Sequence, residues 1–156
     1  MNFRHLKTIL FLCAYSFLFG NCSSPLIETE PEVITDTSEV SITCNAEKGN
    51  KALMGYAGPV YVHLGLITDS SGFPTDWRYV KFKWGSTEKA AEGTPQGKNK
   101  WSYKIHNMRN FFGVPGNEKI IQLAILFRSG NCIDTFCKVL RNADKSDVLI
   151  PVKQKQ

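Results

Sequence analysis

Alternation of apolar and polar side chains, repeated in several short runs, is the feature of this sequence that most constrains its fold. Residues 40–45 (VSITCN) and 60–67 (VYVHLGLI) place apolar side chains at every second position. A period of two puts these side chains on one face of a β-strand. Segments rich in Gly, Pro, Asn, Asp and Ser separate the runs, so the sequence predicts strands joined by turns.

Four further segments extend this pattern. Residues 77–84, 101–105, 119–128 and 147–152 are predicted strands, and the very apolar 119–128 segment is expected to be central. Residues 106–114 predict one helical turn ending at Gly113, because glycine is favoured just after the last helical residue. About seven short strands without a long helix are typical of an all-β, immunoglobulin-like antiparallel β-sandwich. The pattern leaves the strand order open.

The first 21 residues predict a cleaved export signal. Arg4 and Lys7 form a basic start, and residues 8–19 (TILFLCAYSFLF) form an apolar stretch shorter than a membrane-spanning helix. Cys22 follows directly and resembles the cysteine of a bacterial lipobox, which becomes lipidated. We therefore expect a lipid-anchored protein. An ordinary signal peptidase site and a retained anchor are the alternatives.

The chain divides into three expected parts: a signal peptide at residues 1–21, the lipidated cysteine with a tether at 22–38, and a β-sandwich domain at 39–156. The tether carries Glu28, Glu30 and Glu32. Acidic residues behind a lipidated cysteine resemble a signal for export to the outer cell surface, and a solvated linker is the alternative. The roughly 120 residues of the domain suffice for one hydrophobic core.

Charge and motif content argue against several classes of function. The formal net charge is +5, and loss of Arg4 and Lys7 with the signal leaves 17 basic and 14 acidic residues, a net charge of +3. This charge is too small and too dispersed to indicate a nucleic-acid partner. The sequence contains no nucleophile elbow, phosphate-binding loop or metal-ligand cluster. We therefore expect no enzymatic activity, no cofactor and no metal.

The cysteines outside the signal have three expected roles. Cys22 carries the lipid. Cys132 and Cys137 enclose four residues of a polar stretch, and in an oxidising compartment this spacing predicts a local disulfide. Cys44 lies in the alternating 40–45 segment and is then a buried free thiol. A disulfide between Cys44 and either of the other two is the alternative.

Several motifs occur in order along the domain. They are VYVH at residues 60–63, GLIT at 65–68, DWRYV at 76–80, WG at 84–85, RNFFGVP at 109–115, AILFR at 124–128 and NADKSD at 142–147. With these motifs, residues 40–152 resemble the small β-sandwich modules of bacterial α-amylases and of starch-utilisation outer-membrane lipoproteins. The chain departs from that family by placing cysteines in its penultimate loop.

The resemblance implies a noncatalytic module that binds glycan, with a starch-like α-glucan as the first ligand to test. It implies three kinds of partner: a polysaccharide or oligosaccharide, the membrane through the lipid anchor, and other surface lipoproteins or a transporter. The implied location is the bacterial outer membrane, exposed at the cell surface. The alternatives are a structural or protein-interaction subunit of an outer-membrane glycan-uptake complex and an idle remnant of an amylase module.

Aromatic residues suggest where such a ligand would bind, because the C–H faces of sugar rings stack on aromatic side chains. We expect Tyr61 and His63 on one strand, and Trp77 and Tyr79 on the next, to form an exposed platform, with Trp101 as a further contact. Core packing or cross-strand pairing is the alternative for each of them. The exposure of Tyr61, Trp77 and Trp101 distinguishes the two interpretations.

Overall fold

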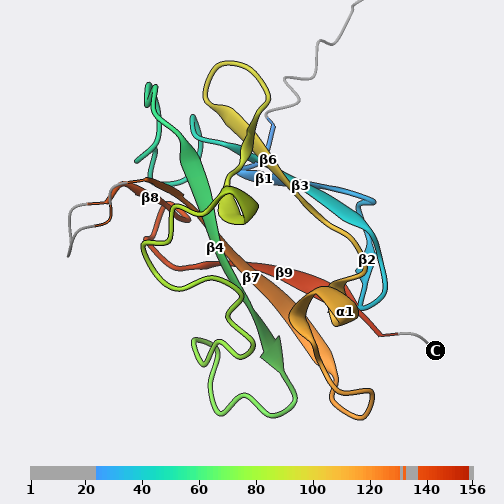
Figure 1. Cartoon of the computed structure of the whole chain (residues 1–156). Coiled ribbons are helices and arrows are strands. Elements are labelled where there is room, and N and C mark those ends of the chain that lie inside the picture. Colours follow the sequence, from blue (N-terminus) through green and yellow to red (C-terminus); the bar gives the residue numbers. More distant parts are fainter. Residues whose placement is uncertain (1–23, 131, 133–136, 155–156) are drawn as a thin grey trace, which may run out of the picture.

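Two β-sheets face each other in the computed structural model, which describes residues 24–130, 132 and 137–154 (Figure 1). The first sheet has the order β1-β3-β6-β5, comprising Ile27–Glu30, Val40–Asn45, Lys100–Ile105 and Thr94–Pro95. The second has the order β2-β9-β7-β4, comprising Ile34–Thr35, Val148–Lys153, Ile120–Ser129 and Val60–Thr68. The short strand β8 (Val139–Leu140) also pairs with β7. The predicted all-β sandwich is confirmed.

The pairings are antiparallel except between β2 and β9, which run parallel. Immunoglobulin constant-type domains place strands A, B, E and D in one sheet and C, F and G in the other. If β1, β3, β4, β5, β6, β7 and β9 are taken as A to G in chain order, the two sheets have this arrangement. The strand order supports the immunoglobulin-like type, which stays a prediction.

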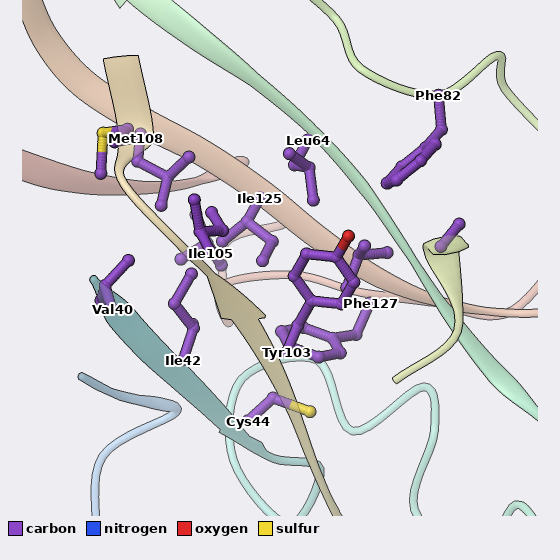
Figure 2. Packing of buried hydrophobic residues seen from close by; sticks show 14 of the residues in the cluster. Val40, Ile42, Cys44, Leu64, Phe82, Tyr103, Ile105, Met108, Ile125 and Phe127 are labelled. Atoms are coloured by element: carbon purple, nitrogen blue, oxygen red, sulfur yellow. The ribbon is translucent and has the colours of Figure 1, made fainter. Parts of the chain in front are cut away.

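The core lies between the two sheets. On the second sheet Val62 lies opposite Phe127 and Leu64 opposite Ile125, and all four side chains are buried. Figure 2 shows the side chains of the first sheet that meet them: Val40, Ile42, Cys44, Tyr103 and Ile105. Each fully buried apolar side chain contributes about 1.5–3 kcal/mol to stability. The alternating positions of both sheets thus form one continuous core.

Two local predictions are confirmed. The segment β7 lies between β9 and β4, the central position expected from its apolar character. The expected helical turn is α1 (Met108–Phe112), in which the Asn107 side chain accepts a hydrogen bond from the Asn110 amide. The turn ends at Gly113, whose φ of 73° lies in the left-handed region that favours glycine.

The folded domain begins earlier than predicted. Residues 27–35, assigned to the tether from the sequence, contain β1 and β2. Ile34 is fully buried, whereas β1 alternates between half-buried and exposed positions. A short edge strand carrying charges does not look like a core strand in sequence, because it buries one face only and its charges discourage edge-to-edge pairing. Residues 1–23, with the predicted signal and Cys22, lie outside the described residues.

Candidate functional site

The outer face of the second sheet is polar and aromatic. Side chains alternate along a strand, so residues 61, 63 and 65 of β4 point away from the core. The outward side chains of this strand pair are Tyr61, His63 and Gly65 on β4, opposite Arg128, Leu126 and Ala124 on β7. This face is where the described structure places the candidate site.

The segment that follows β4 returns along its free edge. Arg78 and Leu66 exchange two backbone hydrogen bonds, of 2.7 and 2.8 Å. A side chain at Gly65 would meet the Arg78 carbonyl oxygen at 3.0 Å and Trp77 Cε3 at 3.4 Å. Because glycine leaves this space free, the Trp77 ring lies directly over the outer face of the sheet.

Residues 77–84 were predicted as a regular strand, and this prediction is wrong. The segment is joined to β4 by one isolated bridge, at Arg78, and by one hydrogen bond from the Lys81 amide to the Leu64 carbonyl oxygen at 3.0 Å. Tyr79 has a φ of 52° that breaks the extended conformation. Trp77 and Trp84 are seven residues apart and would lie on opposite faces of a regular strand. Both instead contact His63.

These rings border a hollow of about 220 Å³, here called the aromatic hollow. Its lining residues are His63, Thr75, Trp77, Val80, Trp84, Leu126, Arg141 and Asp147. The side chain of Trp77 is half-buried, and Trp84 and Val80 are 41% and 43% exposed. The hollow therefore offers apolar and aromatic surface to solvent on one side of an otherwise packed sheet.

The aromatic rings of the hollow form a corner. Trp77 stacks on His63 with an angle of 20° between the ring planes and 5.6 Å between centroids. Trp84 meets the same imidazole edge to face, at 87° and 4.9 Å. The two indoles are therefore steeply inclined to each other and do not lie in one plane.

A charged pair, Arg141 and Asp147, also lines the hollow. The Arg141 guanidinium donates a hydrogen bond to the Asp147 carboxylate, and the two side chains are 31% and 20% exposed. The Asn142 side chain donates to the Asp147 carbonyl at 2.9 Å, and the Arg141 amide donates to Asn50 at 3.2 Å. These bonds hold the pair in place while leaving part of it accessible.

Arg128 points outward from this face and is fully buried by the chain that covers it, which includes Trp84 and Ser86. Its guanidinium donates to the carbonyl oxygens of Ser129 and Ser86, and it lies over the Tyr61 and Trp84 rings at 5.6 and 5.7 Å. Within the described residues it has no carboxylate partner closer than 4.0 Å. Burial lowers its pKa, but an arginine stays charged at neutral pH. A positive charge therefore lies under the aromatic residues.

The buried charge affects His63. Burial first, and the charge of Arg128 second, lower the pKa of His63 below its usual value. Three of the five buried polar side-chain atoms that lack a hydrogen-bond partner in the described part of the chain lie here: His63 Nδ1, Trp77 Nε1 and Arg128 Nε. Each such atom costs about 1–3 kcal/mol. The arrangement is costly for folding and keeps the imidazole neutral.

Of the five residues predicted to contact a ligand, the structure brings His63 and Trp77 into the aromatic hollow. The exposed platform predicted from Tyr61, His63, Trp77 and Tyr79 does not form, and the further contact Trp101 is buried. Tyr61 is 8% exposed, because Arg128 covers its ring and the chain at Gly130 passes close beside it.

Tyr79 and Trp101 lie elsewhere. Tyr79 is half-buried, and its hydroxyl donates to Glu118. Its positive φ is the local cause, because it turns the side chain away from the face that carries Trp77. Trp101 points inward from β6 and is 6% exposed, next to a different hollow. Neither ring is on the outer face of the second sheet.

The sequence prediction missed the other six lining residues of the hollow, and three of these, Trp84, Arg141 and Asp147, supply its second indole and its charged pair. Trp84 belongs to a motif that the sequence shows, but the assumed strand placed it on the face opposite Trp77. Arg141 and Asp147 follow β8 and precede β9, more than 55 residues from Trp84 in sequence. No local pattern connects them with the aromatic residues.

Two larger hollows occur in the described structure. One, of about 530 Å³, is lined by Glu30, Pro31, Glu39, Ser41 and Lys104 and has no aromatic ring. The other, of about 370 Å³, is lined by Gly55, Tyr56, Ala57, Gly58, Pro95, Gly97, Lys98, Asn99 and Trp101. By volume alone, these two hollows would be better candidates for a ligand site than the aromatic hollow. The aromatic hollow combines two accessible indoles with paired charges, which suits recognition of a ring-shaped polar ligand better.

Two of the three cysteine predictions are confirmed, and the third, the lipid on Cys22, lies outside the described residues. Cys132 and Cys137 form a disulfide with their Cα atoms 4.4 Å apart. Cys44 is a buried free thiol, and burial raises its pKa to about 12. Cys132 Sγ also accepts a hydrogen bond from Arg128 at 3.4 Å. The disulfide therefore adjoins the buried arginine.

No protein-family model matches this chain, and no curated protein matches it. Within the described residues, no three His, Cys, Asp or Glu side chains cluster as metal ligands would. No helix there has the length and apolar character required to cross a bilayer. Functional assignment therefore depends on the geometry of the hollow and on the sequence motifs.

Proposed function

We propose that this protein is a noncatalytic glycan-binding module that presents the aromatic hollow to an α-glucan. The observation that carries the proposal is the corner of two partly exposed indoles, Trp77 and Trp84, beside the Arg141–Asp147 pair. The family resemblance of residues 40–152 supports the same ligand class.

The chemistry of the hollow suits a sugar ring. One face of a pyranose carries several C–H groups and stacks on an indole, which offers a large apolar surface. Its hydroxyl groups need both donors and acceptors. Arg141 supplies donors in a fixed plane and Asp147 supplies acceptors, and neither partner is fully buried. The corner and the pair thus address the two kinds of surface that a sugar presents.

The hollow is less suited to catalysis. Glycoside hydrolysis commonly uses two carboxyl groups on either side of the scissile bond. Among the lining residues of the hollow, Asp147 is the one carboxylate, and it pairs with Arg141. A binding role therefore fits these residues better than hydrolysis.

The location is part of the proposal. A lipid on Cys22 would fasten the module to the bacterial outer membrane, exposed at the cell surface, beside other surface lipoproteins or a transporter. The change Cys22→Ala should release the protein from membranes on cell fractionation. Membrane retention of this variant would contradict the lipid anchor.

Affinity electrophoresis tests the binding role. The full chain, purified in a detergent without a sugar headgroup, is run in native gels containing starch, glycogen, pullulan or dextran. We expect retardation by at least one α-glucan, and loss of it in Trp77→Ala and Trp84→Ala. Tyr56→Ala, which alters the 370 Å³ hollow, is the matched control and should keep the retardation. Unchanged migration in every gel would contradict the proposal.

A protein-interaction subunit is the second candidate. The adjacent exposure of Val80 and Trp84 favours it, because exposed tryptophan often anchors a protein interface. The burial of Tyr61 and Trp101 favours it too, since the expected sugar platform required exposed rings. If no glycan binds, this candidate predicts that Trp84→Ala weakens co-purification with a surface complex, whereas Tyr56→Ala does not.

A further inference from the structure

We infer that the aromatic hollow receives the end of a linear glycan chain, and not an internal stretch of the chain. This inference rests on the proposed function and specifies its ligand. It concerns the corner formed by Trp77 and Trp84 and the charged pair Arg141–Asp147, all of which line the hollow.

The inclination of the rings is the first step. A long glucan that stacks along its length needs aromatic faces that follow one surface. Here Trp77 is nearly parallel to His63, at 20°, whereas Trp84 stands at 87° to the same imidazole. A ring stacked on one indole therefore presents its edge to the other. The corner therefore accommodates one sugar ring, and the glycan chain ends at that ring.

The size of the hollow is the second step. Sites for drug-sized ligands occupy about 300–1,000 Å³, and the aromatic hollow occupies about 220 Å³. Leu126 and His63 form its floor from adjacent strands. The space suits one sugar ring with the rest of the chain leaving toward solvent.

The polar groups are the third step. An internal glucose ring has two of its oxygens in glycosidic bonds, so these oxygens cannot donate. A terminal ring has a free hydroxyl at one of these positions. That hydroxyl can donate to the Asp147 carboxylate and accept from the Arg141 guanidinium. A site that hydrogen-bonds a hydroxyl discriminates against a ligand that lacks it, because the polar partners are left unpaired.

A neutral ligand suits the charges around the hollow. Arg141 and Asp147 compensate each other at the rim. Arg128 lies behind Trp84 and keeps a positive charge on that side, so the corner is unfavourable for a cation although two indoles line it. A neutral pyranose avoids repulsion by the Arg128 charge, and it does not require the ion pair between Arg141 and Asp147 to break.

Isothermal titration of the full chain in the same sugar-free detergent tests the inference. The two probes are maltoheptaose, which is linear, and β-cyclodextrin, a closed ring of the same number of glucose units with no chain end. We expect maltoheptaose to bind and β-cyclodextrin to bind about tenfold or more weakly, since a net hydrogen bond is lost. Maltotriose should bind about as well as maltoheptaose, because one end occupies the site in both.

The outcomes separate the two proposals. Equal affinity for the linear and the closed glucan, or affinity that rises steeply with chain length, would overturn end recognition and leave glycan binding standing. Binding of none of the probes would overturn end recognition, and together with unchanged migration in every glucan gel it would remove both proposals. Asp147→Asn keeps the side-chain size and should bring the affinity for maltoheptaose down toward that for β-cyclodextrin, whereas Tyr56→Ala should leave both unchanged.

Discussion

The inner and outer faces of the strand pair β4 and β7 share one backbone but differ in polarity, in burial and in how completely their polar groups are hydrogen-bonded. The inner face carries apolar side chains such as Leu64 and Phe127, which are buried and need no polar partner. The outer face carries His63 and Arg128, which are buried to different degrees and incompletely hydrogen-bonded. It is covered by irregular chain that includes Trp84 and not by a second sheet.

The difference teaches which face stabilises the fold and which is available for recognition. Burial of apolar groups costs no hydrogen bond, so the inner face gains stability from each contact. A buried cation and unpaired nitrogen atoms reduce stability. Such groups are most often found where a protein binds or reacts. The four predictions below test this division, from the largest expected effect to the smallest.

Leu64→Ala should have the largest effect on stability. The side chain is fully buried between the sheets, and its truncation should lower the free energy of unfolding by about 2–5 kcal/mol. Urea unfolding measures the loss. The folded fraction should bind maltoheptaose with unchanged affinity, because Leu64 points away from the hollow. A loss below about 1 kcal/mol would show that the inner face is less tightly packed than described.

Arg128→Met should lower the free energy of unfolding by about 1–3 kcal/mol. Removal of the guanidinium leaves the carbonyl oxygens of Ser86 and Ser129 without their donor, and this outweighs the relief of the buried charge. Arg78→Met is the control, because that side chain is 47% exposed, and it should change stability by less than about 0.5 kcal/mol. Equal unfolding curves for the two variants would contradict a structural role for Arg128.

His63→Gln should alter the pH dependence of stability. Because the folded state lowers the pKa of His63, the unfolded state binds the proton more readily. The wild-type protein should therefore lose stability as pH falls below about 6.5, the usual pKa of histidine. Thermal melts between pH 7 and 5.5 should show a smaller decrease in the variant, and parallel curves would count against the shift.

Tyr61→Phe should have the smallest effect. Its ring packs against the Arg128 guanidinium, outside the aromatic hollow. The affinity for maltoheptaose should therefore stay within about twofold and stability within about 0.5 kcal/mol. The same titration and urea unfolding measure both. A tenfold loss of affinity would show that the Tyr61 hydroxyl contacts the ligand, and that the ligand binds on a different part of the outer face.

Much of the fold follows from local patterns. The period of two in residues 40–45 and 60–67 predicts β3 and β4 and their inner faces, because strand geometry fixes which side chains point together. The continuous apolar run at residues 119–128 predicts β7. Gly113 marks the end of α1 for an equally local reason. The disulfide between Cys132 and Cys137 follows from short spacing.

The candidate site was only half predictable. His63 and Trp77 stood out as aromatic or polar residues within strand-like segments, and both line the hollow. Tyr61 and Trp101 carried the same signal and are buried. Sequence alternation identifies two faces of a strand, but it does not tell which face a covering segment or the opposite sheet will bury.

The sequence by itself therefore determined an all-β sandwich with a core on alternating positions, since these depend on neighbours along the chain. Only the tertiary structure decided the site. The positive φ of Tyr79 turns the chain so that Trp77 and Trp84 share one imidazole. The pairing of β7 with β8 and β9 brings residues 141 and 147 beside them. The first effect depends on a backbone conformation that is rare for residues other than glycine, and the second on pairing between distant strands. No local pattern of side chains records either of them.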